Sequence, residues 1–320
     1  MTLDFHTLDV FTDRVFGGNP LGVFPAAAHL PTGLMQRVAL EMNLSETVFL
    51  GPPETEAGTA RVRIFTPARE VPFAGHPTVG SALFLASGTW TGPDGPRLPP
   101  LPDGDGEVQL VLEENVGPVP VTVRFEGGRP VFARFTTAIL PEHRPSPHPV
   151  ADLAAMVGLS ESDIGGEGPE GSDLRPEMVS CGLEYLVIPV RTIDAVRRSS
   201  LDTARWQRML ADAWAHHVYI VCMDGEGDGV DIRVRMYAPG SGVPEDPATG
   251  SAAAALGGYL SAADGREEAS LSWVVEQGIE MGRPSLLYVE ADRTEGATSA
   301  VRVGGSAVAV SRGVMDTGER

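Results

Sequence analysis

Lysine is absent from this sequence, because all 24 of its basic residues are arginine. A lysine amine holds pyridoxal phosphate as a Schiff base, and a lysine completes the phosphate loop of P-loop nucleotide hydrolases. Class I aldolases use the same amine as their nucleophile. The sequence therefore excludes all three classes of enzyme.

Cysteine is nearly absent as well, since the chain contains only Cys181 and Cys222 and no C-x-x-C pair. Two cysteines are too few for a zinc ribbon, an iron–sulfur cluster or a disulfide framework, so we expect a cytoplasmic protein. His216 and His217 adjoin each other without a third ligand at metal-binding spacing, so no metal site is expected.

Long hydrophobic runs and a basic leader are also missing. The first residues carry no positive charge, so we expect no signal peptide. The longest alanine-rich stretch, 251–263, is too short and too interrupted by glycine to span a bilayer. We therefore expect no membrane partner.

Positive charge is in short supply, since 43 acidic residues leave a formal net charge of −19. Nucleic acids and anionic membrane surfaces both require a positive footprint, so neither is an expected partner. The 320 residues are 42% hydrophobic, which is enough for a sizeable core. The length allows one large domain or two of moderate size.

Local patterns predict an α+β protein. Runs rich in valine, isoleucine, phenylalanine and tyrosine predict strands along most of the chain. Apolar periodicity predicts helices over 31–42, 151–157 and 202–216. Strands and helices are therefore mixed rather than confined to separate parts of the chain.

The chain contains an internal repeat. Arg61–Pro67 resembles Arg233–Pro239, and His76–Ala82 resembles Asp246–Ala252 with proline, glycine and serine at matching positions. Repeats that match in register predict two halves built to one plan. Four prolines between 139 and 150 indicate a linker between these halves. We expect an N-terminal lobe over 1–138, a linker over 139–149 and a C-terminal lobe over 150–320.

Each repeat runs from a strand through a proline turn into an apolar helix. The helices expected at Thr78–Ser87 and Ala248–Leu260 have no polar face, so both should be buried. Each half is therefore expected to be a sheet wrapped around a central helix. His76 and Asp246 each precede a proline, which predicts that they are the N-caps of these helices.

The two helix N-termini predict an anion site. Backbone N–H groups and the helix dipole favour negative charge there, and serine hydroxyls add further donors. We expect both serines in the first helical turn. The substrate should be a small carboxylate that binds at Gly75, Ser81, Gly250 and Ser251.

Three side chains near these turns could carry chemistry: Glu46, His76 and Asp246. Glu46 borders the apolar strand Thr47–Leu50, where loss of water would raise its pKa and suit it to general acid/base catalysis. Simpler roles remain open, because Asp246 could be only a helix cap and Glu46 only a solvated surface acid.

Five segments resemble the signature motifs of the PhzF (phenazine biosynthesis) family. They occur in the family's order and extend over roughly residues 3–311. These segments are Gly18-Asn-Pro20, Asn43-Leu-Ser-Glu-Thr47, Phe73-Ala-Gly-His-Pro77, Glu245-Asp-Pro-Ala-Thr-Gly-Ser251 and Glu276-Gln-Gly…Glu280-Met-Gly-Arg-Pro-Ser285.

The resemblance implies a diaminopimelate-epimerase-like fold. Such a fold has two pseudo-symmetric domains, each a mixed β-sheet wrapped around a central buried helix, with the active site between them. Related epimerases use two cysteines as acid and base. Neither Cys181 nor Cys222 lies in such a motif, so the chain resembles the cysteine-free branch.

The resemblance also implies a cofactor-independent isomerase or epimerase. It would move a proton on a small cyclic or unsaturated carboxylic acid, as in the isomerisation of trans-2,3-dihydro-3-hydroxyanthranilate. Glu46 matches the family's proton-shuttling glutamate, and His76 and Asp246 match its other catalytic residues. A homodimer is implied as well.

Two other functions stay open at this point. The chain could be a non-catalytic protein that binds a small carboxylate on the same fold. It could also be a serine hydrolase that uses Ser251 or Ser81 with His76 and Asp246. No serine lies in a G-x-S-x-G segment, which disfavours the hydrolase.

Overall fold

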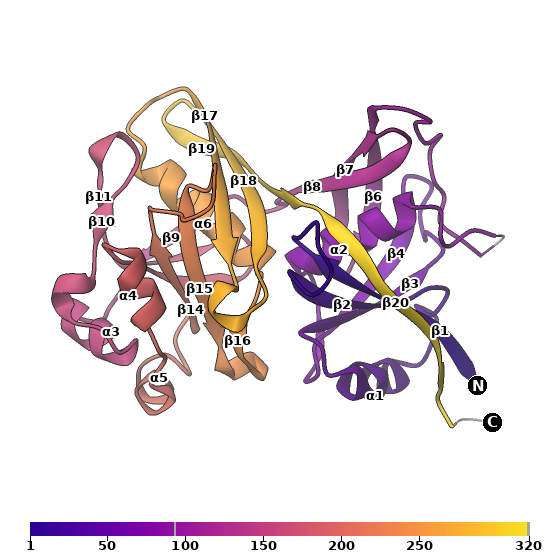
Figure 1. The fold of residues 1–320 in the computed structure, drawn as a ribbon, viewed down its shortest axis with the longest axis horizontal. Coiled ribbons are helices and arrows are strands. Elements are labelled where there is room, and N and C mark those ends of the chain that lie inside the picture. The colour runs from indigo at the N-terminus through magenta and orange to yellow at the C-terminus, as the bar shows by residue number, and fades with distance from the viewer. Residues whose placement is uncertain (93, 319–320) are drawn as a thin grey trace. The chain divides into compact units, whose positions relative to one another are not determined.

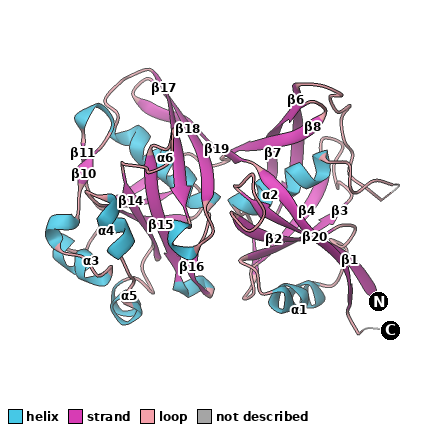
Figure 2. Cartoon of the chain, viewed as in Figure 1, coloured by secondary structure: helices cyan, strands magenta, loops and turns pink. Residues whose placement is uncertain are grey.

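The computed structural model describes residues 1–92 and 94–318 and divides into two compact units. The first unit consists of Met1–Thr136 together with the segment from Gly304 onward, and the second unit is Thr137–Val303. Figure 1 and Figure 2 show that both units combine many strands with a few helices. The predicted α+β class is confirmed.

The first unit has a mixed sheet. β2 (Asn19–Phe24) is parallel to β3 (Glu46–Gly51), β3 is antiparallel to β4 (Ala60–Phe65), and β4 is parallel to β6 (Gly106–Glu114). The other strands extend this sheet by antiparallel pairing; they are β1 (Thr2–Val10), β5 (Glu70–Val71), β7 (Gly117–Glu126), β8 (Arg129–Thr136) and β20 (Ala307–Asp316).

The second unit repeats the same pairing order. β13 (Glu184–Pro189) is parallel to β14 (His217–Cys222), β14 is antiparallel to β15 (Ile232–Ala238), and β15 is parallel to β17 (Ala269–Gln277). The remaining strands are β9 (Glu142–Pro145), β12 (Glu177–Ser180), β16 (Val243–Asp246), β18 (Ser285–Thr294), β19 (Ala297–Gly305) and the small pair β10 (Gly166–Glu167) and β11 (Asp173–Leu174). The predicted duplication is confirmed.

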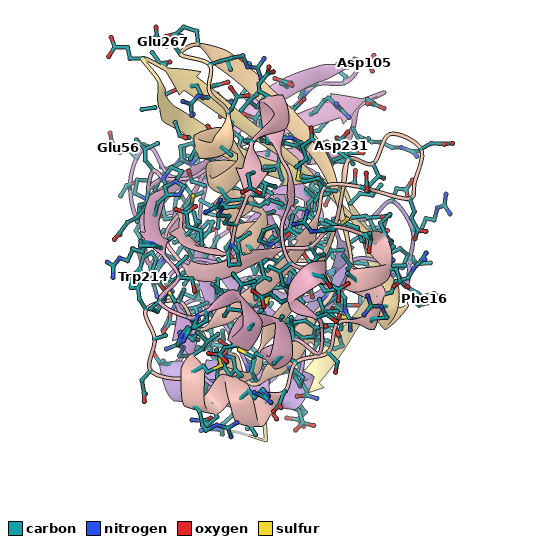
Figure 3. All side chains as sticks on the ribbon, turned by 90° about the vertical axis from the view of Figure 1, so that its left-hand side faces the viewer. Phe16, Glu56, Asp105, Trp214, Asp231 and Glu267 are labelled. Carbon is teal, nitrogen blue, oxygen red and sulfur yellow. The ribbon has the colours of Figure 1, made fainter. Side chains whose placement is uncertain are left out.

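The duplication extends to single hydrogen bonds. In the first unit, Thr59 donates its N–H to the carbonyl of Val111 at 2.8 Å, and its hydroxyl accepts from the Val111 N–H. In the second unit, Asp231, labelled in Figure 3, makes the same two contacts with Val274 through its N–H and its carboxylate. The loop before β4 and the loop before β15 are therefore attached to their sheets in the same way.

A helix without a polar face lies within the sheet of each unit. α2 (Gly75–Ala86) and α6 (Gly250–Ala263) are buried along almost their whole length. Figure 1 shows strands of the same unit around each of them. Glycine lets these strands come close, because a Cβ at Gly80 would lie 2.5 Å from Leu21 Cδ2. The predicted central helices are confirmed.

The start of α2 differs from the prediction. α2 begins at Gly75 after the N-cap Ala74, so His76 lies inside the first turn and is not the cap. Pro77 is then the third helical residue. Proline is tolerated there because the N–H groups of the first turn have no acceptor within the helix.

The start of α6 differs as well. α6 begins at Gly250 after the N-cap Thr249. Asp246 is the last residue of β16 and pairs with Met236 of β15, which keeps its backbone extended. The prediction that Asp246 caps the helix is therefore wrong, although its side chain still lies beside the cap residue.

The outer face of each sheet is covered by amphipathic helices. α1 (Thr32–Met42) packs Leu34, Met35 and Val38 on the phenylalanines of the first sheet. The second sheet is covered by α3 (Val150–Met156), α4 (Ile193–Arg198) and α5 (Thr203–Met209). α5 is shorter than the predicted helix 202–216: it ends at Met209, and the Trp206 indole donates to the carbonyl of His216 just before β14.

Two segments lie elsewhere than the sequence predicts. The expected linker 139–149 contains β9, which pairs with β12 inside the second unit. The segment from Gly304 onward belongs to the first unit, because β20 pairs with β1 along its whole length. An unpaired strand edge exposes a row of N–H and C=O groups. β9 supplies hydrogen-bond partners for such groups of β12, and β20 supplies them for β1.

Close packing at α2 makes Gly80→Ala a test of the central helix. The added methyl group would meet Leu21 Cδ2 at 2.5 Å and Val10 Cγ2 at 2.8 Å. Overpacking of this kind costs about 1–3 kcal/mol, so we expect a loss of that size in the free energy of unfolding. Urea unfolding measures it.

Gly33→Ala in α1 is the matched control, because nothing lies within 4 Å of its added carbon. It should be neutral or raise the free energy of unfolding by up to about 1 kcal/mol. A Gly80→Ala variant as stable as Gly33→Ala would contradict the packing described for α2.

Candidate active site

The first unit brings Glu46 and His76 together. Glu46 is the first residue of β3, and His76 is the second residue of α2. Glu46 Oε2 lies 3.4 Å from His76 Nδ1. The imidazole is almost fully buried, whereas 19% of the Glu46 side chain is exposed. The pair therefore joins a ring shielded from water to a carboxylate that a small molecule can reach.

Burial keeps the His76 ring neutral. Loss of water lowers the pKa of the imidazole to about 3, although a hydrogen bond to the Pro20 carbonyl opposes this shift. A neutral imidazole has one donor nitrogen and one acceptor nitrogen. His76 Nε2 has no hydrogen-bond partner in the part of the chain that the structure describes. This nitrogen is therefore available to a ligand without first losing a protein contact.

The segment Gly18-Asn19-Pro20 supports this histidine. Asn19 Nδ2 lies 3.4 Å from His76 Nδ1, beside the contact that the Pro20 carbonyl makes with the ring. Gly18 has a φ of +61°, and a Cβ there would lie 2.3 Å from the Val10 carbonyl oxygen. Glycine is required at this turn. The segment was found in the sequence as a motif, but its role toward His76 was not predicted.

Asp246 is the centre of a second polar group, in the second unit. The Thr249 hydroxyl donates to Asp246 Oδ2, and the Gln277 amide donates to the Asp246 backbone carbonyl at 2.8 Å. Gln277 also holds Thr249, since its Oε1 accepts from the Thr249 N–H and its Nε2 donates to the Thr249 hydroxyl. Asp246 is thus a buried carboxylate fixed beside the first turn of α6.

Two tyrosines adjoin this group. Tyr185 and Ser251 share a hydrogen bond of 2.7 Å between their hydroxyl oxygens. The ring of Tyr219 lies 6.3 Å from that of Tyr185, and its buried hydroxyl has no hydrogen-bond partner among the described residues. Burial, together with nearby Tyr185 and Asp246, raises the pKa of Tyr219 well above its usual value. Neither tyrosine stands out in the sequence, because aromatic residues in strands ordinarily belong to the core.

The motif that follows β17 holds the turn between Asp246 and α6. Gly278 has a φ of +77°, and a Cβ there would lie 2.5 Å from the Pro247 carbonyl oxygen. The Ser285 hydroxyl donates to the same carbonyl at 2.9 Å. Together with Gln277, these residues fix the turn that carries Asp246.

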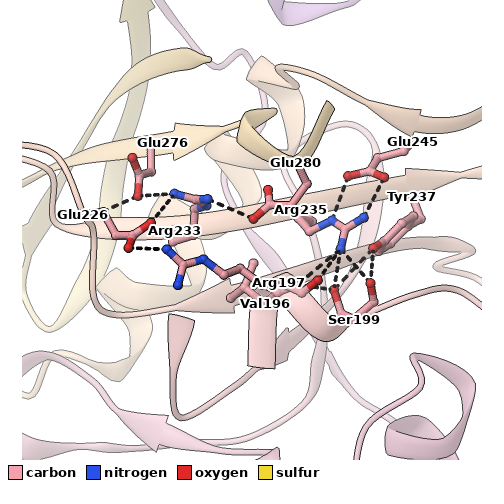
Figure 4. A network of polar contacts seen from close by, with 10 residues as sticks. All are labelled: Val196, Arg197, Ser199, Glu226, Arg233, Arg235, Tyr237, Glu245, Glu276 and Glu280. Carbon is pink, nitrogen blue, oxygen red and sulfur yellow. Dashed lines mark hydrogen bonds and ion pairs between the residues drawn. The ribbon is translucent and has the colours of Figure 1, made fainter. Parts of the chain in front are cut away.

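Arg233 holds this motif at two points, as Figure 4 shows. Its buried guanidinium donates to Glu276 Oε1 at 2.8 Å and to Glu280 Oε1 at 2.9 Å. Glu276 comes directly before Gln277, and Glu280 lies in the turn that leads to Ser285. The ion pairs therefore stabilise the residues that position Asp246.

The predicted anion-binding residues lie at the helix starts, with one exception. Gly75 and Gly250 are the first residues of α2 and α6, and Ser251 lies in the first turn of α6. Ser81 lies in the second turn of α2, because this helix begins earlier than predicted. Its hydroxyl is fully buried and has no hydrogen-bond partner within the described chain. The prediction that both serines lie in the first turn is wrong for Ser81.

Neither serine has the surroundings of a nucleophile. A serine nucleophile requires a general base within hydrogen-bond reach of its hydroxyl. Ser251 is bonded to Tyr185, and within residues 1–92 and 94–318 the Ser81 hydroxyl has no partner. This geometry does not favour the serine hydrolase.

In the part of the chain that the structure describes, no three histidine, cysteine, aspartate or glutamate side chains gather as they would around a metal ion. None of the helices there is long and apolar enough to cross a membrane.

The chain is similar to several known proteins over nearly its whole length. A family model described as "Phenazine biosynthesis-like protein" (PhzC-PhzF) matches residues 8–313. An uncharacterized isomerase of Mesorhizobium japonicum is 39% identical over 98% of this chain and 99% of its own length. The trans-2,3-dihydro-3-hydroxyanthranilate isomerase of Pseudomonas aeruginosa is 33% identical over 97% of this chain and 98% of its own length.

A solved structure shows the same fold. It is the PhzF-family phenazine biosynthesis protein of Bacillus anthracis, with a TM-score of 0.83 and 24% sequence identity. The alignment covers 98% of this chain and 99% of that protein. The fold implied by the sequence motifs is confirmed.

Arg233→Met tests the support of the Asp246 turn. Removal of the guanidinium leaves the buried carboxylates of Glu276 and Glu280 unpaired, and breaking such a buried pair costs about 3–5 kcal/mol. We expect a loss of that size in the free energy of unfolding, measured with urea at neutral pH.

Arg302→Met is the control, because Arg302 pairs with Glu290 and Asp292 where all three side chains are at least a quarter exposed. Exposed pairs contribute about 1 kcal/mol or less. If both variants lose the same free energy of unfolding, the ion pairs of Arg233 do not stabilise the turn that holds Asp246.

Proposed function

The chain belongs to the PhzC-PhzF family of phenazine biosynthesis-like proteins, and from that premise we propose that it is a cofactor-independent isomerase or epimerase. Its substrate would be a small cyclic or unsaturated carboxylic acid. The observation that carries the proposal is the contact between Glu46, a carboxylate at the solvent boundary, and His76, a buried neutral imidazole.

We assign proton transfer to Glu46. Its carboxylate would remove a proton from a carbon whose C–H bond is weakened by conjugation. The C–H bond breaks, an O–H bond forms on Glu46, and the electron pair spreads over the conjugated system. Glu46 then returns the proton to another carbon, which isomerises the substrate, or to the opposite face, which epimerises it. General acid/base catalysis of this kind contributes about 10²–10⁴-fold.

His76 and Asp246 are assigned to the other catalytic tasks. A neutral imidazole can donate a hydrogen bond to charge that develops on the substrate without itself giving up a full proton. This role requires the ring proton on Nε2, with Nδ1 accepting from the Asn19 amide, and Nε2 has no partner among the described residues, which supports it. Asp246, fixed by Thr249 and Gln277, would orient a donor group of the substrate.

The substrate carboxylate would bind at helix N-termini. The first N–H groups of a helix have no acceptor within it, and the helix dipole favours an anion there. Gly75 and Gly250 are the first residues of α2 and α6, and Ser251 adds a hydroxyl held by Tyr185. Ser81 is proposed as a further contact by resemblance to the family only.

We also propose a homodimer in the cytoplasm, with the small carboxylate as its ligand and neither nucleic acid nor membrane as a partner. The acidic composition, with a net charge of −19, supports the exclusion of polyanionic partners. Size-exclusion chromatography with light scattering tests the dimer.

The competing function is binding of a small carboxylate without catalysis. Proton NMR in D₂O separates the two, because a proton-transfer enzyme exchanges one C–H of its substrate for deuterium and a binding protein does not. The panel starts with trans-2,3-dihydro-3-hydroxyanthranilate, the substrate named for the Pseudomonas aeruginosa relative, and continues with other cyclic and unsaturated carboxylates. Exchange with none of them, together with saturable binding, would favour the binding protein.

Glu46→Gln tests the assigned base. The amide keeps the size and hydrogen bonding of the side chain but cannot accept a proton. We expect kcat to fall at least about 10²-fold while the substrate still binds. Asp246→Asn should lower kcat less, because the amide can still accept the Thr249 hydroxyl.

Glu41→Gln on the exposed face of α1 is the control and should leave kcat unchanged. If Glu46→Gln retains the wild-type kcat on a substrate that the wild type exchanges, the assignment of Glu46 is wrong, and Asp246 becomes the candidate base.

A further inference from the structure

We infer that Glu114 is kept as a neutral carboxylic acid and is a positioning residue, which donates a hydrogen bond into the first turn of α2 and so holds His76 in place. Glu114 is the last residue of β6 and is only 5% exposed. The protonation of Glu114 follows from the contacts of this side chain alone. Its effect on catalysis rests on the proposed function of His76.

The proton can be placed by counting donors. Glu114 Oε1 lies 2.7 Å from the hydroxyl oxygen of Thr78, and that oxygen lies 2.8 Å from the carbonyl oxygen of Ala74. Thr78 has a single hydroxyl hydrogen, so it can donate to only one of these oxygens. An ionised Glu114 would leave one pair of oxygens in contact without a hydrogen. A protonated Glu114 donates to Thr78, and Thr78 donates to Ala74, which satisfies both contacts.

The other oxygen of Glu114 indicates the same protonation state. Glu114 Oε2 is buried and has no hydrogen-bond partner among residues 1–92 and 94–318. A negative charge on an unpartnered buried oxygen costs far more than the unpartnered carbonyl oxygen of a neutral acid. In agreement with this geometry, burial raises the pKa of Glu114 to about 8, although Thr78 and Arg61 oppose the shift.

The charge that acts on Glu114 comes from Arg61 of β4, and the polar contact comes from Thr78 of α2. The Arg61 guanidinium is occupied elsewhere, because it donates to the backbone carbonyls of Val62 and Glu113. It therefore does not pair with the Glu114 carboxyl group.

Glu113, the neighbouring residue on the other face of the strand, is held in the opposite, ionised state. Its carboxylate accepts the N–H of Glu54 at 2.6 Å and the N–H and hydroxyl of Thr55. Burial alone would raise the pKa of Glu113, but these hydrogen bonds outweigh it and lower the pKa. Two adjacent glutamates are thus held in different protonation states by the donors around them.

The second unit shows what an uncharged side chain does at the same position. Arg61 is registered with Glu113 across β4 and β6, as Arg233 is with Glu276 across β15 and β17. Glu114 and Gln277 are therefore equivalent positions. Gln277 is a neutral amide that donates to the Thr249 hydroxyl at 3.0 Å, beside the start of α6. A protonated glutamate can likewise donate to a threonine hydroxyl near the start of α2, that of Thr78, and an ionised one cannot.

Ionisation of Glu114 would remove this donor. Because the folded-state pKa is raised, the folded chain keeps a proton that the unfolded chain releases. Stability from this group is therefore fully present below the ordinary glutamate pKa of 4.5 and is lost as the pH rises toward about 8. Above that value the first turn of α2 loses this donor, and His76 loses one of its supports.

Glu114→Gln is the test, with Glu113→Gln as the matched control. Infrared spectroscopy of the wild type at pH 6 should show the carbonyl band of a buried protonated acid. The band should be missing in Glu114→Gln and present in Glu113→Gln. A band that persists in Glu114→Gln, or no such band in the wild type, would overturn the inference.

Thermal unfolding gives a second readout that needs no substrate. Between pH 6 and pH 8 the Tm of the wild type and of Glu113→Gln should fall by at least about 3 °C more than that of Glu114→Gln. Parallel curves for the wild type and Glu114→Gln would overturn the inference. Failure of Glu114→Gln to fold would do so too, since an amide can donate the same hydrogen bond to Thr78.

The positioning role is tested on a substrate that the wild type turns over. Glu114→Ala should lower kcat/KM at least 10-fold, and Glu114→Gln should restore most of that loss at pH 8. Equal kcat/KM values for the two variants would overturn the positioning role. If no substrate is found, the infrared and Tm measurements still decide the protonation state of Glu114. A failure of the proposed function can therefore be distinguished from a failure of this inference.

Discussion

The burial of a whole helix in each unit is the constraint on which the rest of the structure depends. α2 and α6 have no polar face, so their apolar side chains are covered by strands of their own unit. Burial also takes the helix N-termini out of bulk water, where the first N–H groups and any polar side chain nearby need partners from the protein. The polar residues of the candidate site gather at these two places because the helices are buried.

The two units supply these hydrogen-bond partners from the same arrangement of strands and loops but with different residues. Thr59 and Asp231 attach equivalent loops through the same backbone hydrogen bond and a side-chain acceptor, and Arg61 and Arg233 occupy equivalent registers. At the helix starts the chemistry differs. The first unit places a neutral histidine beside a reachable carboxylate, which suits proton transfer. The second places a carboxylate among hydroxyl and amide donors, which suits orientation of a ligand. Duplication therefore preserved the support and left the functional positions free to diverge.

The sequence predicted the parts of this arrangement that depend on local pattern. The helices without a polar face and the repeat at Arg61 and Arg233 are visible as composition and spacing, and the structure bears both out. The helix starts were misplaced by a few residues, because proline fits several first-turn positions. The domain boundaries also differ, since β20 pairs with a strand more than 290 residues earlier in the chain, and no local pattern indicates such a pairing.

The residues proposed to react could be chosen from the sequence, but the residues that support them could not. Glu46, His76 and Asp246 could be found because they interrupt apolar segments within motifs. Asn19, Gln277 and Glu114 could not, because each acts on a residue brought close only by folding. Glu114 shows the difference most clearly. Beside Glu113 in the sequence, it is one of two consecutive acids, which ordinarily indicate a solvated turn. Only the alternating faces of β6 separate them, and only the donors on each face decide which one keeps its proton.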